Sequence, residues 1–146
     1  MSDDQVLSAA AFNQLFTEID GIYHNYAKRF HLSQTALFLL CTLYESDTPL
    51  TQRQLANEWH YPPQTVNSFL KRLEAEGAVR LEDAPHDRRS KYIILTERGR
   101  AFCERIVQPL IDAEERAFGA LSHDEQALLL TLPRKYFTLL AQEIDT

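Results

Sequence analysis

The sequence predicts a mainly α-helical fold with a small β-hairpin wing, in which a winged helix-turn-helix is flanked by N- and C-terminal dimerisation helices. Three observations predict it. Apolar residues recur at helical spacing between residues 62 and 77, a short capped segment precedes them, and two runs of strand-forming residues follow. The order helix, turn, helix and hairpin is that of a winged helix-turn-helix.

The N-terminal part predicts two helices. Apolar and aromatic side chains recur at three- and four-residue steps from about Ala9 to Phe30, which indicates a long amphipathic helix. Ser33 can cap a second helix that ends at Leu43 or Tyr44. Because residues 36–41 are apolar nearly all round, we expect this second helix to be buried on several sides.

The helix-turn-helix is predicted from residues 51 to 77. Thr51 and Gln54 have the spacing of a capping box, which predicts the start of a short helix. Pro62 disfavours helical geometry at the residue before it, so a turn of a few residues follows. The second helix has one apolar face and ends at Gly77, which tolerates positive φ. That apolar face consists of Val66, Phe69, Leu70 and Leu73.

The opposite face of this second helix is polar and contains no acidic residue before Glu74. Its side chains can donate hydrogen bonds to phosphates or to base edges, and they are Gln64, Asn67, Ser68, Lys71 and Arg72. Such a helix suits the major groove of DNA. Taken alone, the pattern is more often that of an ordinary amphipathic surface helix.

A β-hairpin with a basic tip is predicted after Gly77. Residues 79–81 and 91–95 are rich in strand formers, and the polar loop between them, residues 82–90, contains the adjacent Arg88 and Arg89. Thr96 can then cap a helix to about Phe118, in which Pro109 should introduce a kink. Ser122 and Glu125 form a second capping box, which opens a last helix through Ile144 that is kinked or broken near Pro133.

The motifs of residues 50–99 resemble the DNA-binding core of the MarR family of bacterial regulators. The matching pieces cover about a third of the chain and are Leu50-Thr51-Gln52, Thr65-Val66, Leu73-Glu74 through Gly77, Asp87-Arg88-Arg89, and Leu95-Thr96-Glu97 through Gly99. Two positions depart from the family pattern. His60 stands where the turn often has glycine, and Pro62 stands where the recognition helix often starts with Asp or Ser.

The resemblance implies a homodimeric, ligand-responsive repressor that binds a palindromic operator in double-stranded DNA. The implied DNA-contacting residues are Gln64, Thr65, Asn67, Ser68, Lys71 and Arg72 in the major groove, with Arg88, Arg89 and Lys91 of the wing at the minor groove. The family also implies a cleft for a small aromatic effector, lined here by Tyr23, Tyr26, Phe30, His31, Phe38 and Phe102. The alternative is that these aromatic side chains only fill the core of the dimer.

The chain is expected to be one subunit, residues 1–146, with a DNA-binding lobe at 33–99 and a dimerisation region at 1–32 and 100–146. The end helices carry more apolar surface than a winged helix of about 60 residues can cover, so a two-fold dimer is the economical arrangement. A monomer whose ends fold back on its own core is the alternative.

The net charge of −6 does not exclude DNA binding, because the charge is unevenly distributed. Residues 51–100 hold nine Lys and Arg against seven Asp and Glu, while the remainder holds six against fourteen. The cations therefore gather where the recognition helix and the wing are predicted. With no bilayer-length apolar run and no signal-peptide pattern, we expect a cytoplasmic protein with no membrane partner.

No pattern of residues predicts an enzyme, a cofactor or a metal site. The chain lacks a glycine-rich phosphate loop, and its five histidines have no metal-ligand spacing. Cys41 and Cys103 are expected to be reduced core residues, although a reactive thiolate at Cys103 is an alternative. The rival function is a winged helix used for protein–protein assembly without DNA, which has no need for Arg88 and Arg89 at the hairpin tip.

Overall fold

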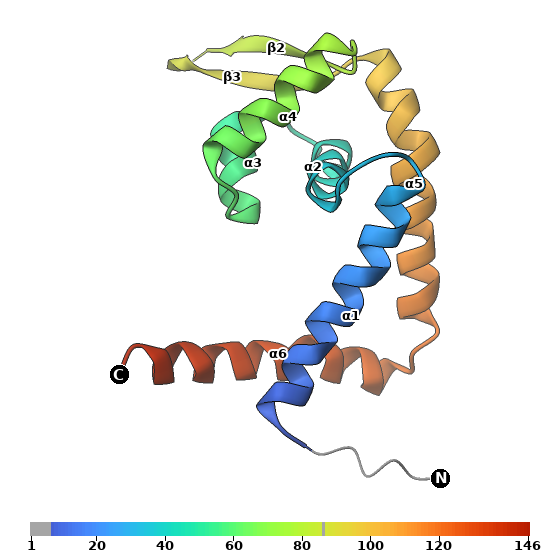
Figure 1. The fold of residues 1–146 in the computed structure, drawn as a ribbon, viewed down its shortest axis with the longest axis vertical. Coiled ribbons are helices and arrows are strands. Elements are labelled where there is room, and N and C mark those ends of the chain that lie inside the picture. Colours follow the sequence, from blue (N-terminus) through green and yellow to red (C-terminus); the bar gives the residue numbers. More distant parts are fainter. Residues whose placement is uncertain (1–6, 86) are drawn as a thin grey trace. The chain divides into compact units, whose positions relative to one another are not determined.

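The computed structural model describes residues 7–85 and 87–146, without the side chains of Asp87 and Arg88. The described residues divide into two compact units, one that ends at Val107 and one that comprises Gln108–Thr146. Its elements follow one another as α1 (Ala9–Lys28), α2 (Gln34–Glu45), β1 (Leu50–Thr51), α3 (Gln52–Trp59), α4 (Pro63–Ala75), β2 (Val79–Ala84), β3 (Asp87–Leu95), α5 (Glu97–Gly119) and α6 (His123–Ile144) (Figure 1). The predicted mainly helical fold with a hairpin wing is confirmed.

Helix α2 lies at the centre of the first unit. Its residues Leu37, Leu39 and Leu40 are completely buried, as the apolar stretch at 36–41 predicted. Side chains from α3, α4 and the first half of α5 complete this core. The fully buried ones are Leu55, Val66, Cys103, Ile106 and Val107.

The predicted helix starts are confirmed by hydrogen bonds at the caps. Ser33 Oγ accepts the Ala36 N–H at 3.0 Å, and Thr96 Oγ1 accepts the Gly99 N–H at 3.1 Å. Thr51 and Gln54 form the complete capping box of α3, since each side chain bonds the backbone of the other. These bonds satisfy backbone donors that have no partner within the helix.

The wing differs from the prediction in the length of its strands. The prediction of a polar loop over residues 82–90 is wrong, because β2 continues to Ala84 and β3 starts at Asp87. Cross-strand pairing explains the extension: Glu82 lies opposite Tyr92, and Asp83 lies opposite Lys91 with a complementary charge. The pairing shifts register after Asp83, as in a β-bulge.

A third strand, β1, was not predicted. Leu50 pairs with Ile93 and Thr51 with Tyr92, so β3 lies between β1 and β2 in an antiparallel sheet. Two residues are too short to give a periodic pattern in the sequence. The strand joins the start of α3 directly to the wing.

The end of α4, the start of β2 and the start of α5 meet at a tight junction. Gly77 has φ +75° and follows the last turn of α4, as predicted for a helix end. The Thr96 hydroxyl donates to the Gly77 carbonyl, and the Thr96 N–H donates to the Ala78 carbonyl at 3.0 Å. Gly99 of α5 lies so close to Ala78 that a Cβ built on it would overlap the Ala78 oxygen.

The second unit contains the end of α5 and all of α6. Ser122 and Glu125 form the predicted capping box at the start of α6. Pro109 and Pro133 lie inside continuous helices. Of the two alternatives for Pro133, a break is therefore wrong, and a kink stays a prediction. Each proline removes one backbone donor, and the remaining bonds of a helix of more than 20 residues keep it continuous. Within the described ranges, no helix is both long enough and apolar enough to cross a membrane.

Candidate nucleic-acid interface

The turn before α4 is built on a left-handed residue. His60 has φ 55° and ψ 33°, and the next N–H, of Tyr61, donates to the Ala56 carbonyl at 3.0 Å. This conformation is the reason why glycine suits the position in the family that the sequence resembles. The recognition helix then starts at Pro63, with Pro62 before it and no side-chain cap. Proline is compatible with a first helical turn because its missing N–H would have had no helical partner.

Helix α4 has the two faces that the sequence predicted. Val66, Leu70 and Leu73 are buried against the core. The polar residues of the predicted DNA-contacting face are exposed, apart from Asn67, which is half-buried; the exposed ones are Gln64, Thr65, Ser68, Lys71 and Arg72. The first turn of α4 contains no acidic side chain. The first turn of the helix therefore presents a polar surface with no acidic side chain of its own to repel phosphates.

One predicted contact residue, Arg72, already has an anionic neighbour. Its Nε donates to Glu76 Oε1 at 3.2 Å, one helical turn further along α4. Both side chains are exposed, so this ion pair contributes little to stability. A phosphate that contacts Arg72 therefore has to compete with the Glu76 carboxylate. The four-residue spacing of Arg72 and Glu76 in the sequence could have indicated this ion pair.

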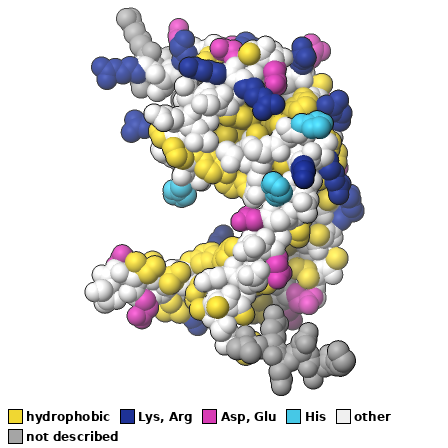
Figure 2. Space-filling model, in the orientation of Figure 1, with side chains coloured by type: hydrophobic (Ala, Val, Ile, Leu, Met, Phe, Trp, Pro, Cys, Tyr) yellow, Lys and Arg dark blue, Asp and Glu magenta, His cyan; other side chains and the backbone are white. Residues whose placement is uncertain are grey.

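A groove of about 740 Å³ lies between the start of α3, the start of α4 and the wing. Among the described residues that line it are three cations, Arg53 from α3 and Arg89 and Lys91 from β3, and no acidic residue. Gln52 and Asn57 add polar groups that can donate hydrogen bonds. Figure 2 shows Lys and Arg side chains spread over the part of the surface formed by the helix-turn-helix and wing. Arg53 was missed by the sequence interpretation, because only the β1–β3 pairing brings the start of α3 beside the wing.

Of the two wing arginines, the structure describes the side chain of Arg89 only. The side chain of Arg88 lies outside the described residues. Arg89 is exposed and belongs to the register shift of β3, between the pairs Ala84–Asp87 and Asp83–Lys91. Bulges of this kind turn side chains away from a regular ladder. Arg89 thus lies near the hairpin end, as predicted, but on a strand.

The aromatic residues predicted for an effector cleft contact one another. The Tyr23 ring meets Phe38 edge-on at 5.2 Å, and Phe38 stacks on Trp59 at 4.9 Å. Tyr26 packs edge-on against Phe30 at 5.2 Å. His31 is exposed and has φ 57°.

Tyr26 also joins α1 to α5. Its hydroxyl donates to the Ile106 carbonyl at 2.5 Å. Burial raises the pKa of this phenol, and the nearby Arg29 guanidinium partly offsets the effect. The phenol therefore remains a hydrogen-bond donor at neutral pH.

The cysteines lie within the helical core. Cys103 is fully buried and Cys41 is half-buried. Burial raises the pKa of the Cys103 thiol to about 11, so it remains protonated and unreactive at neutral pH. This disfavours the alternative of a reactive thiolate at Cys103. In the described residues, no three His, Cys, Asp or Glu side chains gather closely enough to hold a metal ion.

Comparisons with known proteins identify relatives among transcriptional regulators. The sequence profile of the MarR family matches residues 30–90. An uncharacterized helix-turn-helix transcriptional regulator of Bacillus cereus is 32% identical over 113 residues, which cover 77% of this chain and 74% of that protein. The transcriptional repressor NicR of Pseudomonas putida is 29% identical over 104 residues. That match covers 71% of this chain but only 65% of NicR, a little under two thirds of its length.

Solved structures share the fold. Staphylococcus aureus MepR in its DNA-binding conformation matches with a TM-score of 0.75 and 22% identity, covering 90% of this chain and 97% of that one. Bordetella bronchiseptica BpsR, whose DNA binding is regulated by 6-hydroxynicotinic acid, matches with a TM-score of 0.67 and 22% identity, covering 93% and 95%. At these identities the matches show the fold alone.

Proposed function

The chain belongs to the MarR family of winged helix-turn-helix regulators, and from that premise we propose that it represses transcription by binding a palindromic operator as a homodimer, under the control of a small-molecule effector. The observation that carries DNA binding is the groove of Arg53, Arg89 and Lys91 beside the acid-free start of α4. Cations on both sides of a concave surface suit a phosphate backbone that passes between them.

We assign different roles in DNA binding to the polar face of α4 and to the cations of the groove. The exposed polar residues of α4 enter the major groove and select bases, with Gln64, Asn67 and Ser68 as the base-contacting candidates. Arg89 enters the minor groove, where narrow A·T-rich sequences attract a guanidinium. Arg53 and Lys91 contact the phosphates between these two grooves. A module for protein assembly without DNA would not need cations at all three places.

The dimerisation region in this proposal comprises residues 1–32 and 100–146, and residues 33–99 form the DNA-binding lobe. Large apolar side chains are exposed on α1 and along α6, which has no buried residue. A two-fold arrangement covers the same faces of both subunits. It also presents two recognition helices to half-sites about 10 base pairs apart.

The effector is proposed to be a small aromatic acid or phenol held near Tyr23, Tyr26, Phe30, His31, Phe38 and Phe102. Tyr26 links α1 to α5 at this place, so a molecule inserted there would displace one helix relative to the other. Regulation requires that the effector bind one spacing of the recognition helices more tightly than the other.

The proposal is tested by fluorescence anisotropy with DNA from upstream of the protein's own gene, measured over a range of salt concentrations. Arg89→Ala and Arg53→Ala should each weaken binding and reduce the salt slope by about one for each phosphate that is no longer neutralised. Arg134→Ala on α6 removes the same charge outside the interface and should leave the slope unchanged. Equal slopes for all three variants and the natural protein would refute the interface. A salicylate-type acid added to the same titration tests the effector.

A further inference from the structure

The turn that leads into α4 lacks two features that usually fix a helix start. Pro62 at the N-cap offers no side-chain hydrogen bond to the helix. His60 keeps a left-handed conformation although it carries a side chain, which strains the turn. The Tyr61 N–H connects the turn to α3 by donating to the Ala56 carbonyl at 3.0 Å. The direction of α4 therefore depends on the side chains that hold this turn in place.

Two aromatic side chains flank His60 and stack on each other. Trp59 is the last residue of α3, and Tyr61 follows the left-handed residue. Their rings are nearly parallel, at 16°, with centroids 6.4 Å apart. Residues i and i+2 point to nearly opposite sides in a helix and in a strand, so it is the left-handed residue between them that lets these rings meet. The ring contact therefore favours the conformation that the turn requires.

The indole of Trp59 also attaches this aromatic pair to α2. It stacks on the Phe38 ring with centroids 4.9 Å apart and an angle of 9° between the planes. Its Nε1–H donates to Thr42 Oγ1 at 2.6 Å, and the Thr42 hydroxyl donates in turn to the Phe38 carbonyl at 3.0 Å. The stack fixes the plane of the indole, and the hydrogen bond fixes its rotation within that plane. The turn is thereby tied to the helix at the centre of the core.

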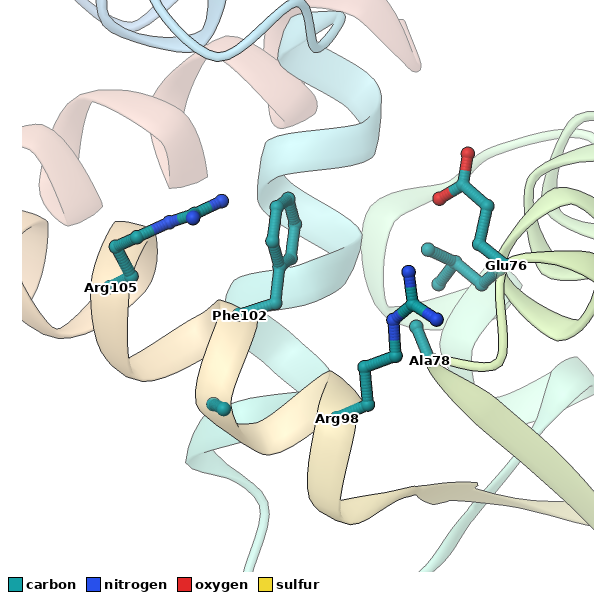
Figure 3. A pocket seen from close by; sticks show the side chains of 7 residues that line it. Glu76, Ala78, Arg98, Phe102 and Arg105 are labelled. Atoms are coloured by element: carbon teal, nitrogen blue, oxygen red, sulfur yellow. The ribbon is translucent and has the colours of Figure 1, made fainter.

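The other end of α4 is held separately, at the junction with α5. The Ala78 carbonyl, just past the helix end, accepts the Thr96 N–H at 3.0 Å. Ala78 also lines the same pocket as Arg98 and Phe102 of α5 (Figure 3). With this end fixed, a displacement of the turn tilts the whole helix, whose 13 residues span about 20 Å. The tilt moves Gln64 most among the base-contacting candidates, because Gln64 lies nearest the turn.

We propose that Trp59 is a positioning residue for sequence recognition: its indole, held on α2 by Phe38 and Thr42, fixes the turn from which α4 enters the major groove. This role rests on the proposed DNA-binding function. Base readout needs donors and acceptors aligned with the base edges, whereas attraction to phosphates decreases only gradually with distance. Loss of the indole should therefore reduce the preference for the operator sequence more than the affinity for DNA in general.

The test is fluorescence anisotropy with two labelled duplexes, one from upstream of the protein's own gene and one of the same length with its sequence scrambled. The natural chain should prefer the first duplex. Trp59→Ala should reduce this preference about tenfold, because the turn loses both the stacking and the hydrogen bond to α2. Its affinity for the scrambled duplex should change less than about twofold, since the phosphate-contacting cations remain. Trp59→Phe keeps an aromatic ring and should recover most of the preference.

Two further variants separate positioning from stability. Thr42→Val keeps the size of the side chain but removes the oxygen that accepts the indole N–H. It should lower the preference about threefold, and it tests the role even where Trp59→Ala does not fold. Val107→Ala is the control for lost stability, because Val107 is fully buried on α5 and its truncation weakens the core without removing a ring from the stack. Below its unfolding temperature, measured by thermal unfolding, it should keep the full preference.

Three results would each overturn the positioning role of Trp59. They are an unchanged preference in Trp59→Ala and Thr42→Val, a loss of preference in Val107→Ala as large as in Trp59→Ala, and an equal loss of affinity for both duplexes. A natural chain that binds the two duplexes equally would overturn the proposed repressor function, and this role with it. A natural chain that prefers the upstream duplex, with variants that keep the same preference, would contradict the positioning role alone.

Discussion

Gly99 is the residue on which the junction between α4, the wing and α5 depends. A side chain there would overlap the Ala78 carbonyl, whose oxygen would lie much closer than 3.0 Å to the new Cβ. The opposing atom belongs to the backbone, so no side-chain rotation can relieve the overlap. The Ala78 carbonyl also accepts the Thr96 N–H. Moving this carbonyl away from the new Cβ would therefore disturb the hydrogen bond that connects the residue before α5 to the residue before β2.

We predict that Gly99→Ala lowers the free energy of unfolding by about 2–3 kcal/mol, the cost of overpacking a fixed backbone. Gly119→Ala is the matched control on the same helix, because no atom lies within 4 Å of its new Cβ. Urea unfolding followed by circular dichroism measures both. Equal urea midpoints for the two variants would show that the junction accommodates the new Cβ without loss of folding free energy.

His60 shows how far a single residue can be interpreted from the sequence. The sequence marks it as a departure from a position where glycine is frequent. The structure gives the reason, because the backbone there is left-handed with φ 55°. A side chain in that region costs about 1–2 kcal/mol of steric strain, and the turn is kept despite that cost.

At the scale of elements, the capping box of α6 makes the stability of this helix depend on pH. The Glu125 carboxylate accepts the Ser122 N–H at 2.7 Å. This bond is the larger cause of a lowered pKa of the Glu125 carboxyl, and the hydrogen bond with the Ser122 hydroxyl is the smaller one. The folded pKa lies below the ordinary value of 4.5, so the stabilisation is present above that pH. It is lost as the pH falls through the folded pKa.

We therefore predict that the helix content of the natural chain decreases more between about pH 5 and pH 3 than that of Glu125→Gln, as measured by far-ultraviolet circular dichroism. Glutamine keeps an oxygen that can accept the Ser122 N–H but does not titrate. Glu143→Gln, near the other end of α6 and away from the box, is the control for removing one carboxylate. A pH profile of Glu125→Gln identical to that of the natural chain would contradict the assignment.

Local signals predicted the helices well and the sheet less well. Caps at Ser33, Thr51 and Ser122 marked helix starts correctly, because a cap acts within three residues of sequence. Strand β1 and the extension of β2 to Ala84 depend on pairing with residues far along the chain, which a local pattern does not contain. The same long-range pairing brings Arg53 beside the wing. For this reason the sequence indicated the recognition helix and the wing arginines but not the groove between them.

At the scale of the whole molecule, the exposed apolar surface is the property that needs a partner. On α1, Ile22 is 66% exposed, and on α6, Leu132 and Leu139 are 54% and 50% exposed. The last two are seven residues apart and share one face of the helix. Contiguous apolar surface of this kind marks interaction sites, since isolated soluble chains rarely leave it in water.

We predict that the natural chain is a dimer at micromolar concentration and that the Leu132→Glu/Leu139→Glu double variant is a monomer, as measured by light scattering. Two carboxylates placed in an apolar interface would have to lose their hydration without a partner, which strongly disfavours association. Gln142→Glu adds charge on the same helix without removing an apolar side chain and should remain dimeric. The monomer should also lose most of its affinity for a two-half-site operator, because the second recognition helix would no longer be tethered to the first. A natural chain that scatters as a monomer, or a double variant that remains dimeric, would show that other surfaces cover α1 and α6.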